Sequence, residues 1–108
     1  MLTVKQRLLL DSLKILYNKI QRQDTVLTEE YCKKIVKLTV DEIYKVNPDR
    51  NVGKIAITWF DSKMNRTKNI DENTESFEID FYDVHTGVPW LICRFFKQRA
   101  KVGIYCCS

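Results

Sequence analysis

The side chains that could carry out chemistry in this chain are few, and the best candidates lie close together. His85 is the only histidine among the 108 residues, and Asp83 precedes it by two positions, near enough to orient the imidazole. A thiol from Cys93 or Cys106 would complete the base, nucleophile and orienting group of covalent catalysis. Both polar residues, however, fall in a predicted hairpin turn, where such residues are ordinary, and both thiols fall at predicted core positions. No P-loop, GxGxxG or HExxH motif occurs, and we predict that the chain is not an enzyme.

The four cysteines are the residues that could support metal binding or redox chemistry. They are Cys32, Cys93, Cys106 and Cys107. Because no CxxC pair and no second histidine accompany them, we predict no metal site and no cofactor. Strand alternation points the side chain of Cys106 inward and that of Cys107 outward. We expect two thiols without a function at the end of a strand, and a redox role for the outward Cys107 is the alternative.

The sequence was searched for targeting signals and membrane spans, and its composition indicates the class of protein. Charges interrupt the apolar N-terminal stretch, no cleavage site follows it, and no run of about 20 apolar residues could span a membrane. We therefore expect a cytoplasmic protein with free thiols and no membrane contact. A hydrophobic content of 44% with three glycines and two prolines indicates one folded domain, residues 1–108. The net charge of +4 selects no class of partner.

Two amphipathic helices are predicted in the first half, at residues 3–22 and 29–46. Thr3 with Gln6 fits a capping box, and apolar residues then recur at helical spacing. Thr28 can cap the second helix, whose first turn carries two glutamates. Pro48 requires that helix to end near residue 47.

Four strands follow, at residues 54–60, 76–84, 88–96 and 101–107, because apolar residues there alternate with polar ones. Residues 61–75 contain almost no apolar side chains, so we predict a long exposed hairpin loop. We rank plain flexibility above a functional role for this loop.

A tight turn at Gly87 predicts the register of the central hairpin. If Val84 opposes Val88, the apolar residues of the two strands share one face, Glu78 meets Arg94 and Tyr82 meets Trp90. The predicted fold is α+β, with two N-terminal helices packed on one face of a four-stranded antiparallel meander.

The sheet face away from the helices is the predicted site. It is too apolar for a face that only water covers, and Trp, Tyr and Arg are typical of binding hot spots. The predicted binding residues are Trp90, Tyr105, Arg94, Tyr82, Phe96, Lys101 and Phe60. The alternative is that this face has no binding role and is apolar because a helix, a terminus or the long loop folds over it.

These patterns favour a small non-enzymatic module that binds a partner protein or a second copy of itself. We expect an inhibitor or regulator of a larger partner, of the phage or mobile-element type. This expectation comes from what small proteins of that type commonly do, and no residue of this sequence indicates it. The alternative is single-stranded nucleic-acid binding, since aromatics interleaved with Arg and Lys resemble a stacking platform. We rank nucleic-acid binding second, because Glu78 and Asp80 place negative charge on the same face.

Overall fold

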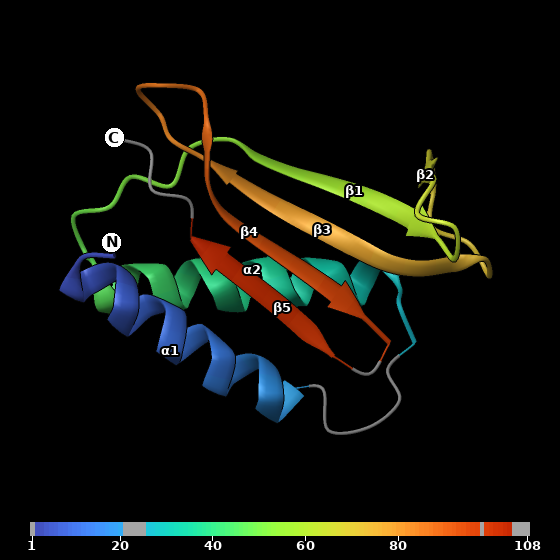
Figure 1. The fold of residues 1–108 in the computed structure, drawn as a ribbon, viewed down its shortest axis with the longest axis horizontal. Coiled ribbons are helices and arrows are strands. Elements are labelled where there is room, and N and C mark those ends of the chain that lie inside the picture. Colours follow the sequence, from blue (N-terminus) through green and yellow to red (C-terminus); the bar gives the residue numbers. More distant parts are fainter. Residues whose placement is uncertain (1, 21–25, 98, 105–108) are drawn as a thin grey trace.

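The computed structural model describes residues 2–20, 26–97 and 99–104, which form two helices and one antiparallel sheet (Figure 1). The helices are α1 (Val4–Ile20) and α2 (Glu29–Val46), and the strands are β1 (Ile55–Asp61), β2 (Arg66–Thr67), β3 (Thr74–Tyr82), β4 (Pro89–Phe96) and β5 (Ala100–Ile104). The strand order is β2-β1-β3-β4-β5. The predicted α+β class and antiparallel sheet are confirmed.

Both predicted helix caps are present. The backbone N–H of Thr3 donates to Oε1 of Gln6 at 2.8 Å, and the N–H of Gln6 donates to Oγ1 of Thr3 at 3.1 Å. This reciprocal pair is the capping box, which satisfies two amides that the first helical turn leaves open. Thr28 caps α2 by accepting from the N–H of Tyr31 at 3.0 Å. No helix in the described ranges is both long and apolar enough to cross a membrane.

The prediction of four strands was wrong, because part of the predicted loop pairs with β1 as the short strand β2. Asp61 makes the connecting turn, since its Oδ1 accepts from the N–H groups of Lys63 and Asn65, each at 2.9 Å. Met64 completes the turn with a positive φ of 65°. An aspartate that accepts hydrogen bonds from nearby backbone amides ends the strand and forms a turn. Such a turn cannot be predicted from the spacing of hydrophobic residues.

The second half of the same segment is also ordered by an aspartate. Asp71 donates its N–H to Oγ1 of Thr74, and its Oδ1 accepts from the N–H of Asn73 at 2.8 Å. Ile70 packs against the core cluster, so this segment is anchored beside the sheet. Most of residues 61–75 are exposed, as predicted, but the segment contains two turns and a short strand, so the prediction of a structureless loop is corrected.

One core joins both helices to alternate positions of β3 and β4. Its most deeply buried members are Leu13, Tyr17, Cys32, Ile35, Ile43, Phe77, Ile79, Phe81, Leu91, Cys93 and Phe95. A row of aromatic rings crosses the core: Tyr17 meets Phe95 edge to face, Phe95 stacks on Phe77, and Phe77 meets Trp59 edge to face. The core face of the sheet is thus apolar across three strands, as the alternation predicts.

The core also contains one buried polar link. The hydroxyl of Tyr17 lies 2.7 Å from that of Thr39 and donates to Sγ of Cys93 at 3.3 Å, while Thr39 donates to the carbonyl of Ile35. These contacts tie α1, α2 and β4 together at one point. Because each polar atom is paired, the link does not carry the cost of an unsatisfied buried group.

Candidate binding surface

The register between β3 and β4 follows the predicted pairing over most of its length. Phe77 pairs with Phe95, Glu78 with Arg94 and Phe81 with Leu91. The pairing changes at the hairpin end, where the register shifts and Tyr82 pairs with Pro89. Trp90 is the extra residue of this bulge, and the predicted meeting of Tyr82 with Trp90 was wrong.

The turn itself accounts for the shift. The N–H of Asp83 donates to the carbonyl of Val88 at 2.9 Å, and the N–H of Gly87 donates back to the carbonyl of Asp83 at 3.0 Å. Gly87 has the predicted left-handed φ, at 70°. The loop closes on Asp83 and Val88, so Val84 does not oppose Val88 as predicted, and one residue of β4 is left over.

Trp90 consequently lies with the core and away from the predicted binding face. Only 6% of it is exposed, and it belongs to the same cluster as Leu9 and Ile43 from the two helices. An extra residue in one strand breaks the alternation of side chains, which is why the sequence pattern misplaced the indole. The assignment of Trp90 to the outer face is corrected on this ground.

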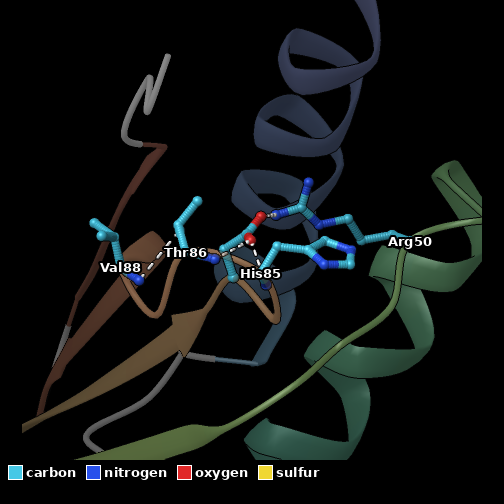
Figure 2. Close-up of polar contacts among 5 residues, drawn as sticks. Arg50, His85, Thr86 and Val88 are labelled. Carbon is cyan, nitrogen blue, oxygen red and sulfur yellow. Dashed lines mark hydrogen bonds and ion pairs between the residues drawn. The ribbon is translucent and has the colours of Figure 1, made fainter.

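Arg50 covers Trp90, and sequence reasoning missed it. Its guanidinium carbon lies 3.9 Å from the centroid of the indole ring, and its Nη2 contacts Oδ2 of Asp83 at 3.3 Å. Figure 2 shows the Arg50 side chain reaching from the segment after α2 toward the hairpin, with His85 beside it. A cation over an indole is a favourable contact, and here it joins that segment to the β3–β4 turn.

Asp83 and His85, the pair considered above for catalysis and not predicted to be catalytic, lie in this turn. Oδ1 of Asp83 accepts from the backbone N–H of His85 at 2.8 Å and from that of Thr86 at 3.0 Å (Figure 2). These two amides, with Arg50, hold the pKa of the Asp83 carboxyl below its usual range. The carboxylate therefore binds two backbone amides of the turn through Oδ1 and Arg50 through Oδ2. An open hollow of about 280 Å³ adjoins these groups.

The outer face of the sheet is defined here as the positions that alternate with the core residues. Its members are Lys54, Ala56, Thr58, Phe60, Arg66, Ser76, Glu78, Asp80, Tyr82, Ile92, Arg94, Phe96, Lys101 and Gly103. Five predicted binding residues, Phe60, Tyr82, Arg94, Phe96 and Lys101, are among them. Tyr105 lies outside the described residues.

Phe60 differs from the prediction because only 8% of it is exposed. The guanidinium carbon of Arg94 lies 4.4 Å from the centroid of its ring. Tyr82, Phe96 and Arg94 are half-buried, and Lys101 is exposed. The guanidinium of Arg94 therefore covers the ring of Phe60, so the centre of the outer face presents the charge of Arg94 and not the phenylalanine ring.

A charged cluster occupies the middle of this face. Nη2 of Arg94 contacts Oε1 of Glu78 at 3.3 Å, and Asp80 follows Glu78 on the same face of β3. Desolvation and the neighbouring Glu78 raise the pKa of Asp80 to about 6, against the opposing effect of Arg94 and Arg66. Oδ1 of Asp80 is enclosed, with no hydrogen-bond partner in the described part of the chain.

We expect Asp80→Asn to stabilise the protein at pH 7.5 and to change little at pH 4. The raised pKa means that the folded state holds its proton more tightly, so this contribution is present below about pH 4 and is lost as the pH rises through about 6. Removing the charge should add roughly 1 kcal/mol, about 4 °C in Tm, after allowance for solvent screening.

Thermal unfolding of both forms between pH 4 and pH 8 measures this difference. Asp41→Asn, on the exposed side of α2, is the matched control, because it also removes one negative charge. A Tm difference that does not vary with pH, or that grows toward low pH, would contradict the assignment.

The cysteines within the described ranges are buried thiols. Burial raises the pKa of both Cys32 and Cys93 to about 12, which keeps them protonated and unreactive at neutral pH. Among residues 2–20, 26–97 and 99–104, no group of three His, Cys, Asp or Glu side chains could hold a metal ion. Cys106 and Cys107, for which we considered a redox role, lie outside those ranges.

Comparison with known proteins adds no relative to this picture. No protein-family model, no curated protein and no solved structure matches the chain.

Proposed function

We propose that this chain is a non-enzymatic binding module for another protein, and that the outer face of the sheet makes the contact. An inhibitor or regulator of a larger partner, of the phage or mobile-element type, is the role we propose for it in the cytoplasm. A second copy of the chain is the other protein partner that this face could take.

One observation carries the proposal: the outer face combines half-buried apolar groups with charge. Ile92, Tyr82 and Phe96 are half-buried there, around the ion pair of Arg94 with Glu78. The buried residues of both helices belong to the core on the other face. Aromatic and aliphatic side chains around an arginine, bordered by the exposed Lys101, resemble the make-up of protein interfaces.

Single-stranded nucleic acid remains the alternative, and the contacts of Arg94 weigh against it. Arg94 is already neutralised by Glu78, and Asp80 adds negative charge beside it. A phosphate backbone requires free positive charge, and the exposed cations described on this face are Lys54, Arg66 and Lys101, not the central Arg94. The geometry therefore supports a protein partner better.

Ile92→Asp should weaken capture of the partner at least tenfold. The change places a carboxylate on the outer face directly opposite Asp80 of β3, so circular dichroism first checks that the variant is folded. The immobilised protein is used to capture partners from cells of the native host, with mass spectrometry for proteins and sequencing for nucleic acids. Sedimentation of the purified chain measures self-association with the same variants.

Ile15→Asp on α1 is the control, because Ile15 is 58% exposed on the solvent side of that helix. Capture should survive it. If Ile92→Asp recovers the same partners as the parent protein, the outer face is not the binding surface. If the recovered material is nucleic acid, and binding falls steeply between 50 and 200 mM salt as phosphate contacts require, the alternative replaces the proposal.

A further inference from the structure

Strand β5 is the edge of the sheet on the side of α1. It pairs with β4 alone among the described strands, from Leu91 with Ile104 to Phe95 with Ala100. The turn before it closes with the N–H of Phe96 donating to the carbonyl of Arg99 at 2.8 Å. Because hydrogen-bonded and non-bonded pairs alternate from that point, the backbone groups of Ala100 and Val102 point away from β4, toward the free edge.

A groove runs between this edge and the first helix. Helix α1 lies alongside β5 (Figure 1). The cavity between them measures about 480 Å³ and is lined by Lys14, Tyr17, Asn18, Ala100, Lys101 and Val102. One wall is therefore a strand edge whose outward backbone groups pair with no described strand, and the other wall is a helix. An extended chain that enters such a groove can add to the sheet as another strand.

The side chains at the edge leave room for an added strand. Ala100 is small, and a Cβ placed on Gly103 would meet no atom within 4 Å. Natural edge strands are commonly protected by bulky cover, proline or charge. Within β5, Ala100–Ile104, the charged residue is Lys101.

The charge of the groove selects the occupant. Lys14 and Lys101 contribute two positive charges, and no carboxylate is among the residues that line the cavity. Pairing β5 with a second copy of itself would add the positive charge of the copy's lysines to a groove that already holds Lys14 and Lys101. A segment that carries Asp or Glu would instead bring carboxylates to a groove whose charged lining residues are these two lysines.

We propose that the groove between α1 and β5 binds an acidic, extended segment of a partner protein, which adds to the free edge of β5 as a further strand. This inference rests on the proposed function as a protein-binding module and names the chemistry of its partner. Backbone pairing at Ala100 and Val102 provides the attachment, and Lys14 and Lys101 provide the selection for acidic side chains.

The test is an NMR titration with a capped eight-residue peptide of alternating Glu and Val, against the same peptide with Lys in place of Glu. The acidic peptide should shift the amide signals of Ala100 and Val102 and slow their hydrogen exchange at least tenfold. The basic peptide should do neither. Absence of any change at these amides with millimolar acidic peptide overturns the proposal, and so does an equal response to both peptides.

Variants separate the charge from the strand edge. Lys14→Glu should weaken peptide binding at least fivefold, whereas Lys37→Glu, on the exposed side of α2, should leave it unchanged. Ala100→Pro removes an edge donor and should abolish binding, while Ala100→Val keeps that N–H and should bind. Binding that survives both Lys14→Glu and Ala100→Pro contradicts the groove as the site.

The capture assay distinguishes failure of this inference from failure of the proposed function. If the acidic peptide does not bind while Ile92→Asp still abolishes capture, the groove is excluded and the binding function stands. If no protein partner depends on Ile92 or Lys14, the proposed function fails, whatever the peptide does.

Discussion

Trp90→Ala lowers the free energy of unfolding by about 3–5 kcal/mol, the range for truncating a buried Trp or Phe. The indole is enclosed by core residues of both helices and by the guanidinium of Arg50. Truncation leaves a cavity at the bulge and removes the surface on which Arg50 lies. Urea unfolding followed by circular dichroism measures the loss, which for a domain of this size is a large share of the total stability.

Tyr82→Ala is the matched control, since Tyr82 stands on the outer face at the same end of the hairpin and is half-buried. We expect it to cost about 1 kcal/mol, as is typical of a side chain outside the core. Trp90→Phe should cost less than the alanine change, because Nε1 of Trp90 makes no hydrogen bond to the described residues. If Trp90→Ala leaves stability unchanged, the indole is exposed and the original assignment to the outer face is restored.

Phe77→Ala is expected to cost a similar amount, about 3–5 kcal/mol, because this ring joins more aromatic groups than any other named here. It stacks on Phe95, with centroids 5.1 Å apart, and contacts Trp59 and Tyr31 edge to face. Aromatic pairs add to the free energy of burial beyond their area alone. The unfolding midpoint in urea should fall with little change in the slope.

Phe96→Ala on the outer face provides the comparison. Phe96 is half-buried, and the guanidinium carbon of Arg99 lies 4.7 Å from the centroid of its ring. Its removal should cost about 1 kcal/mol or less and should reduce partner capture instead. Equal destabilisation by Phe77→Ala and Phe96→Ala would mean that both faces of the sheet are cores, and that the outer face is covered.

Most of the fold could be predicted because it depends on local and periodic signals. The caps at Thr3 and Thr28 need only residues within one turn of the helix, and both were found where expected. The pairing of Phe77 with Phe95 and of Glu78 with Arg94 follows from matching two alternating patterns. The strand β2 was missed because its two residues carry no pattern, although Asp61 followed by Asn65 was a readable signal for the turn before it.

The candidate site was predicted less well, because its side chains depend on contacts far apart in the chain. The sequence by itself determined the α+β class, the helix caps, the apolar core face and the pairing of the outer charges. Only the tertiary structure decided that Trp90 turns to the core, that Arg50 covers it and that Arg94 covers Phe60. The physical reason is that alternation predicts a face only while the ladder is regular: one extra residue at the β3–β4 bulge moves an indole from the predicted binding face to the interior.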